Sequence, residues 1–109
     1  MTAHGDQGPV IVGRLELRPN ARAVLLDGSP VAIGGRAFDI LDMLAREAGH
    51  LVAQEDLLAE VWAGRKVEAN NLQVQIRALR RTLGPGAIVT VSGRGYQLTW
   101  TRDDQAQRV

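Results

Sequence analysis

The spacing of apolar residues changes close to Arg36, and this change restricts the folds that the chain can adopt. Before that point the apolar residues lie in short segments, at 10–17, 23–26 and 31–33, that are rich in valine, leucine and isoleucine. Such segments are typical of strands, and the sequence Asp27-Gly28-Ser29-Pro30 between the last two is typical of a turn. We therefore predict a small antiparallel sheet with three strands in the first third of the chain.

From Arg36 onward the apolar residues recur every three or four positions, which is the spacing of one face of a helix. The helices that we predict run from Arg36 to Gly49, from about Gln54 to Trp62, and from Glu68 or Ala69 to Leu83. Gly84-Pro85-Gly86 ends the third helix, because proline interrupts a helix and glycine is favoured just past its end. Two further strands are predicted at 87–91 and 96–100, joined by a glycine-rich turn at 92–95.

A sheet, three helices and a hairpin, in this order, are the elements of a winged helix-turn-helix domain of the α+β class. The length of 109 residues suits one such domain. We place it at residues 10–100, with an N-terminal antiparallel sheet, a three-helix core and a C-terminal β-hairpin wing. Residues 1–9 are predicted to be a disordered N-terminus, and residues 101–109 a disordered tail or the start of a linker.

The composition argues against an enzyme. The chain has no cysteine, and its two histidines, His4 and His50, have no second ligand or nucleophile at a workable spacing. We therefore expect no catalysis, no metal, no cofactor and no small-molecule substrate. The apolar runs are too short to cross a bilayer, and the first residues lack the apolar core of a signal peptide, so we expect a cytoplasmic protein.

Charge is distributed unevenly along a chain whose formal net charge is only +1. Residues 39–68 hold seven acidic residues against three basic ones, whereas residues 69–102 hold five arginines and no acidic residue. A purely cationic segment of this length suits the phosphate backbone of a nucleic acid. The alternative is a basic face that is merely solvated.

The predicted third helix has two different faces. At about 100° per residue, Leu72, Ile76, Leu79 and Leu83 fall on one face, which we expect to pack in the core. The opposite face and its flanks carry Asn70, Gln73, Val74, Arg77, Ala78, Arg80 and Arg81. Arginine can bond guanine, the amides can bond adenine, and valine can meet the methyl group of thymine. No acidic residue is placed to pair with the arginines, so we favour groove contact over an ordinary solvated face.

The tip of the predicted hairpin has two interpretations. Gly93 and Gly95 can supply the positive φ angles that a tight turn requires. They can also allow Arg94 to reach into a narrow minor groove, where an A·T tract concentrates negative potential.

The run FDILDMLAREAGHLVAQEDLLAEVWAGRKVEANNLQVQIRALRRTLG, followed by IVTVSGRGYQL, resembles the winged-helix effector domain of the OmpR/PhoB family. The resemblance covers about residues 10–100. It lies in the V-W that ends the second helix, the V-E before the third, the spacing L-x-V-x-I-x-x-L-R, and the ending V-x-x-x-G-Y. The segments GGRAFDIL and VEANNLQVQI look more like domains at the N-terminus of one-component regulators than like those that follow a phosphorylated receiver.

The resemblance implies that the third helix enters the major groove of double-stranded DNA and that the wing enters the minor groove. Together with the helix face, it predicts major-groove contacts by Asn70, Asn71, Gln73, Val74, Arg77 and Arg81, and backbone contacts by Trp62, Gln75 and Arg80. Trp62 is equally well interpreted as a core aromatic residue, and Tyr96 as a packing residue. In the wing, Ser92 stands at the position where the family often has an arginine, so Ser92 and Arg94 are both candidates. The family often has arginine at the position of Ala78, so one base contact is absent or displaced.

The loop at 63–68 often touches RNA polymerase in the family, so Arg65 and Lys66 are candidates for contact with a polymerase subunit or with a phosphate. The resemblance also implies that the domain belongs to a larger regulator and that it binds DNA alone, in tandem or as a dimer. Ala53 stands where the family usually has a serine or threonine that caps the second helix. The alternative function is a winged helix that binds a protein and not DNA.

Overall fold

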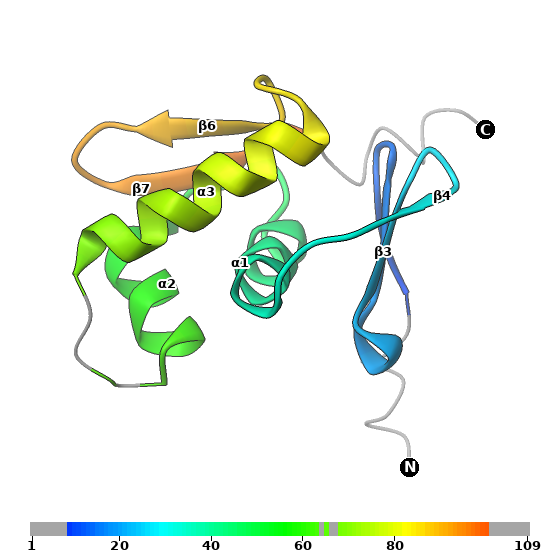
Figure 1. Cartoon of the computed structure of the whole chain (residues 1–109). Coiled ribbons are helices and arrows are strands. Elements are labelled where there is room, and N and C mark those ends of the chain that lie inside the picture. The colour runs from blue at the N-terminus through cyan, green and yellow to red at the C-terminus, as the bar shows by residue number, and fades with distance from the viewer. Residues whose placement is uncertain (1–8, 64, 66–67, 101–109) are drawn as a thin grey trace, which may run out of the picture.

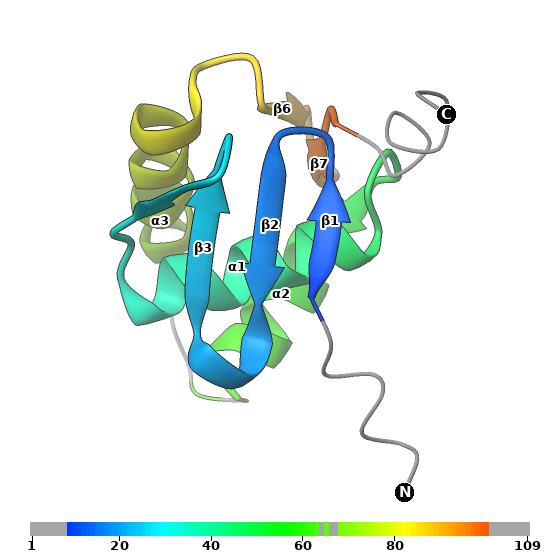
Figure 2. The same cartoon turned by 90° about the vertical axis from the view of Figure 1, so that its right-hand side faces the viewer.

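The computed structural model describes residues 9–63, 65 and 68–100. Its elements follow the predicted order of a sheet, three helices and a hairpin, so the predicted fold class is confirmed (Figure 1). The helix α1 (Gly35–Arg46) lies between the N-terminal sheet on one side and the helices α2 (Gln54–Val61) and α3 (Ala69–Leu83) on the other (Figures 1 and 2). None of the helices in the described part of the chain is long and apolar enough to span a membrane.

The N-terminal sheet has four antiparallel strands and not the three that we predicted. They are β1 (Val10–Val12), β2 (Leu15–Arg18), β3 (Ala23–Leu26) and β4 (Ser29–Val31), paired in sequence order, with the 3-10 turn η2 (Pro19–Ala21) between β2 and β3. The segment predicted as one strand is divided because Gly13, with φ of 58°, reverses the chain and brings Leu15 opposite Val12.

The second turn of this sheet is shorter than its sequence suggested. Only Asp27 and Gly28 form it, with φ angles of 53° and 84°, and Leu26 pairs with Ser29. Positive φ at both central residues is the geometry of a two-residue hairpin, which matches the twist of the flanking strands. The last strand therefore starts at Ser29, and the prediction of a strand at 31–33 was wrong for all but Val31.

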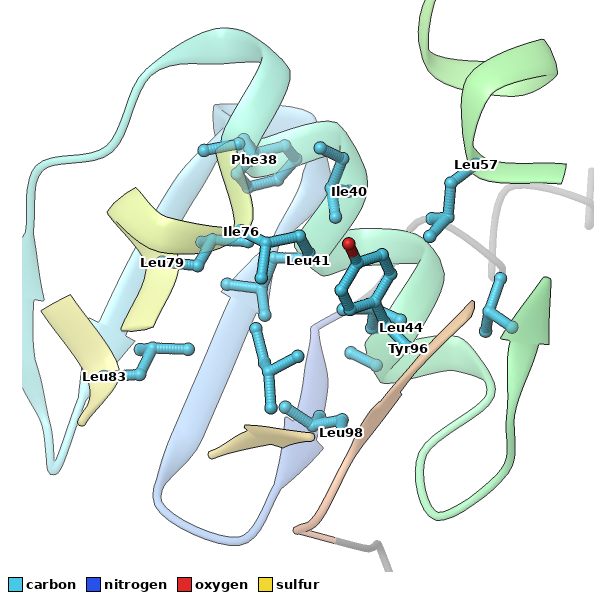
Figure 3. Close-up of a cluster of buried hydrophobic side chains, with 14 of the residues drawn as sticks. Phe38, Ile40, Leu41, Leu44, Leu57, Ile76, Leu79, Leu83, Tyr96 and Leu98 are labelled. Atoms are coloured by element: carbon cyan, nitrogen blue, oxygen red, sulfur yellow. The ribbon is translucent and has the colours of Figure 1, made fainter. Parts of the chain in front are cut away.

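The three helices agree with the predicted ones to within a few residues. The apolar stripe of α3 is buried as predicted, with exposed fractions of 0–4% for Leu72, Ile76, Leu79 and Leu83. Side chains of this stripe lie in the same buried cluster as Leu41 and Leu44 of α1 (Figure 3). Gly84, with φ of 107°, ends the helix as predicted. Burial of this face fixes which side of α3 faces the solvent.

The hairpin is part of a three-stranded sheet with the order β5-β7-β6. Its strands are β5 (Val52–Ala53), β6 (Ile88–Val91) and β7 (Gly95–Leu98), and we call the hairpin of β6, residues 92–94 and β7 the wing. The segment at 51–52, predicted as an extended link, overlaps at Val52 with this strand β5, which pairs with β7. Gly93 has φ of 75°, as a tight turn requires, but Gly95 does not have a positive φ.

Gly95 is required for a different reason. A Cβ atom at this position would overlap the carbonyl oxygen of Val52 and would lie only 2.9 Å from the backbone nitrogen of Gln54. The backbone of the wing therefore lies directly against β5 and the start of α2.

The first turn of α2 is capped in part by the wing. Ala53 is the N-cap residue, with φ of −65° and ψ of 144°, and it makes no side-chain capping hydrogen bond. The N–H group of Gln54 donates instead to the carbonyl oxygen of Arg94, at 2.9 Å. The contact with the wing uses the first N–H group of the helix. A serine at the N-cap would accept a hydrogen bond from the second or third N–H group, so both bonds could form together.

We therefore expect Ala53→Ser to raise the free energy of unfolding by about 0.5–1 kcal/mol. Chemical denaturation of the two proteins measures the difference. Ala59→Ser is the matched control, because Ala59 is exposed within the same helix and serine is a weaker helix former there than alanine. If both substitutions lower the stability, Ala53 is not the N-cap in solution.

Candidate nucleic-acid interface

The outward face of α3 collects the six side chains that the sequence predicts for the major groove. Asn70, Asn71, Gln73, Val74, Arg77 and Arg81 are all exposed. Val74, with an exposed fraction of 46%, adds an apolar side chain to this face. No other described residue forms an ion pair or side-chain hydrogen bond with Arg77 or Arg81, so both guanidinium groups are free to bind a ligand.

Two predicted backbone contacts, Gln75 and Arg80, lie on the flanks of this face and are half-buried. Arg80 points toward the wing. Its Nε donates to the carbonyl oxygen of Ile88 at 3.0 Å, and its Nη2 donates to Oγ1 of Thr90 at 2.8 Å. A guanidinium has five N–H donors, so three of them remain after these two bonds.

A surface groove of about 260 Å³ separates α3 from the wing. Its lining residues are Gln73, Ile76, Arg77, Arg80, Thr90 and Tyr96. The residues that line the groove thus carry two guanidinium groups, an amide and two hydroxyl groups, and no carboxylate. This donor set suits a phosphate group, which arginine binds through charge-assisted hydrogen bonds. Sequence reasoning did not identify Thr90, because its role depends on the packing of β6 against α3.

Trp62 lies in the core. Only 7% of its surface is exposed, and the guanidinium carbon of Arg36 lies 5.5 Å from the centre of its ring. Nη1 of Arg36 also donates to the carbonyl oxygen of Val61 at 2.8 Å. Of the two interpretations of Trp62, the structure shows the core residue, and its contact with DNA stays a prediction. Arg36 was not among the predicted site residues.

Both candidate residues of the wing tip, Ser92 and Arg94, are exposed. The backbone N–H of Arg94 donates to the carbonyl of Val91 at 2.9 Å, while its side chain has no partner among residues 9–63, 65 and 68–100. Arg65 is exposed as well, and its backbone N–H donates to the carbonyl of Trp62 at 2.9 Å. Lys66 lies outside the described residues.

Apart from Glu68, the exposed N-cap residue of α3, the acidic residues lie on other elements. Several belong to α1 and α2, where Asp39 pairs with Arg22 at 3.0 Å and Asp42 pairs with Arg46 at 3.1 Å. Because residues 69–100 contain no acidic residue, α3 and the wing form a continuous surface whose formal charges are all positive. The potential of such a surface attracts a polyanion.

A winged helix-turn-helix whose third helix exposes arginines and amides defines the class of DNA-binding regulatory domains. A family model described as "Transcriptional regulatory protein, C terminal" matches residues 28–98, and the chain belongs to this family, the OmpR/PhoB-type DNA-binding domains. The family resemblance of the sequence is thereby confirmed. The finer likeness to domains at the N-terminus of one-component regulators stays a prediction.

Three similar proteins illustrate the match. The transcriptional regulatory protein CutR of Streptomyces coelicolor is 38% identical over 86 residues, which are 77% of this chain and 40% of CutR. The DNA-binding domain of CpxR from E. coli superposes with a TM-score of 0.76 and 30% identity, over 84% of this chain and 96% of that domain. The RstA DNA-binding domain of Klebsiella pneumoniae, solved in complex with the RstA box, superposes with a TM-score of 0.73 and 31% identity, over 84% of this chain and 96% of that domain.

The two solved domains thus share their fold with most of this chain. The chain spans less than half the length of CutR. The matched relatives are transcriptional regulators with DNA-binding domains.

Proposed function

We propose that this domain binds specific promoter sequences in double-stranded DNA, as the effector domain of a bacterial transcriptional regulator. The observation that carries the proposal is the continuous surface of α3 and the wing, which has free guanidinium groups and amides and lacks carboxylates. The complex of the similar RstA domain with its DNA box supports it. An α-helix with its side chains is about 10–12 Å across, which fits the width of about 12 Å of a major groove.

In this proposal α3 lies in the major groove. The exposed face from Asn70 to Arg81 meets the base edges, with Arg77 near its centre. The groove between α3 and the wing receives a phosphate, which Arg80 and the neighbouring amide bind. Gln75 approaches the backbone from the flank of the helix. Trp62 can offer at most the edge of its ring to the backbone, because 93% of its surface is covered.

The remaining partners are proposed on the family resemblance. Arg65 is exposed beside the end of α2 and contacts either RNA polymerase or a phosphate. The domain works within a larger cytoplasmic regulator and binds its sites alone, in tandem or as a dimer. Catalysis has no place in this proposal.

An electrophoretic gel shift with promoter fragments at moderate salt separates this function from a protein-binding winged helix. The proposal expects a shifted band that survives an excess of unrelated duplex for at least one fragment. A domain that used the same fold to bind a protein would show no such band. Fragments selected from a random duplex library replace the promoter where its sequence is not known.

The wing tip gives a prediction of its own. Arg94 lies between two glycines and has no described side-chain partner, so Arg94→Ala should leave the melting temperature nearly unchanged. A narrow A·T-rich minor groove attracts arginine most strongly, so we expect the substitution to weaken binding most at sites with an A·T-rich flank.

Titrations on paired sites that differ only in an A·T or a G·C flank measure this effect. Ser92→Ala is the matched control, because Ser92 is the other candidate of the same tip. Equal weakening at both sites would make Arg94 a backbone contact, and no weakening at either would show that the wing does not use it.

A further inference from the structure

We propose that Arg80 is a positioning residue that holds the wing at a fixed distance and angle from α3 before DNA is bound. The proposal rests on the proposed function, because the distance that Arg80 sets is the one between the two groove-binding elements. Positioning of the wing differs from phosphate binding, the other role proposed for Arg80, because it operates in the free protein.

The strand that Arg80 contacts, β6, is an edge strand of its sheet. In the order β5-β7-β6, only one side of β6 pairs with another strand. Arg80 supplies hydrogen bonds from α3 to this strand, from Nε to the carbonyl of Ile88 at 3.0 Å and from Nη2 to the hydroxyl of Thr90 at 2.8 Å. Two bonds to alternate residues of the strand define the angle as well as the distance between β6 and α3.

The opposite edge of the wing is held by a separate contact. There β7 pairs with β5, and the carbonyl of Arg94 accepts a hydrogen bond from Gln54 at the start of α2. The close approach at Gly95 leaves no space between these backbones. The wing is therefore attached to α2 along one edge and to α3 along the other, and Arg80 provides the hydrogen-bonded side-chain contact on the α3 side.

This arrangement favours binding by preorganisation. A wing that could swing away from α3 would have to be ordered when both grooves are occupied, and that ordering opposes association. The half-buried Arg80 side chain is ordered in the free protein, so its own rotamer freedom is not lost on binding. The contact therefore raises the affinity for DNA by positioning the wing, and the uncharged Thr90 side chain adds no ionic contact with the DNA.

Thr90→Val separates positioning from charge. It removes the hydroxyl acceptor, keeps the shape of the side chain and leaves the charge of Arg80 in place. Thr99→Val is the matched control, because the Thr99 hydroxyl also bonds backbone carbonyls next to the hairpin, those of Gly86 at 2.7 Å and Ala87 at 3.1 Å, and does not touch Arg80.

The first experiment uses the free protein. The chain has no native cysteine, so Ser92→Cys in the wing and Arg81→Cys near the end of α3 take spin labels without interference. We expect the distribution of label-to-label distances to broaden in Thr90→Val and to stay narrow in Thr99→Val. A distribution of unchanged width in Thr90→Val would overturn the proposal.

The second experiment measures DNA binding by the unlabelled proteins on a selected duplex at several salt concentrations. We expect Thr90→Val to weaken binding about three- to tenfold, with an unchanged dependence on salt because no ionic contact is lost. Unchanged affinity would contradict positioning. A salt dependence reduced by about one phosphate contact would also contradict it and would favour a direct phosphate contact. If the unsubstituted domain binds no DNA, the proposed function fails, while the distance measurement still tests the contact itself.

Discussion

Gly95→Ala is expected to lower the free energy of unfolding by about 3 kcal/mol or more, the largest loss of stability that we predict for a single methyl group. The added Cβ would overlap the carbonyl oxygen of Val52 and crowd the backbone nitrogen of Gln54 and the Cα of Ala53, which is 3.0 Å away. All three neighbours belong to the backbone, so no side chain can rotate to make room. The β5–β7 pairing and the start of α2 would have to move together.

Thermal and denaturant unfolding measure this effect. Gly86→Ala is the matched control, because Gly86 does not need a positive φ and a Cβ there meets no atom within 4 Å. The control should be neutral or slightly stabilising, because alanine restricts the unfolded chain more than glycine does. If Gly95→Ala unfolds at nearly the temperature of the unsubstituted protein, the wing does not lie against β5 as described.

Arg77→Ala is expected to cost about 1–3 kcal/mol in specific DNA binding and to relax the preference for one base pair. Arg77 lies at the centre of the exposed face of α3, lines the groove beside the wing, and forms no bond with another residue in the described part of the chain. Its guanidinium is therefore available to bond a guanine. Removing an exposed side chain should leave the fold intact.

Binding titrations on the selected site and on its single-base variants test this role, with circular dichroism as the check of folding. Arg46→Ala is the matched control, because Arg46 lies on α1 and pairs with Asp42, away from the proposed interface. Equal losses on all DNA sequences would make Arg77 a phosphate contact and not a base-reading residue.

The helices could be predicted from the sequence because their signals are local. The stripe from Leu72 to Leu83 repeats at the helical period, and Gly84-Pro85-Gly86 ends it, so both the limits of α3 and its outward face were predicted correctly. The exposure of the six predicted major-groove residues follows directly from that face. Whether they touch DNA is a property of the complex and stays a proposal.

Features that join distant parts of the chain could not be predicted in the same way. The strand β5 has two residues, too few for a periodic pattern, and it exists because it pairs with Tyr96 and Gly95 more than 40 positions away. The bonds of Arg80 to β6 and the contact of Arg36 with Trp62 likewise depend on packing. The division at Gly13 did have a local signal, because glycine in a strand segment often marks a turn.

The dependence of DNA binding on salt tests the central claim most directly, because contacts with phosphates release bound counterions. If the surface of α3 and the wing neutralises about four to six phosphates, the logarithm of the binding constant should fall with the logarithm of the salt concentration with a slope of about −3.5 to −5.5. Fluorescence anisotropy with a labelled duplex gives this slope from titrations at several salt concentrations. A slope close to zero, or no binding at low salt, would contradict the assignment of this surface to DNA.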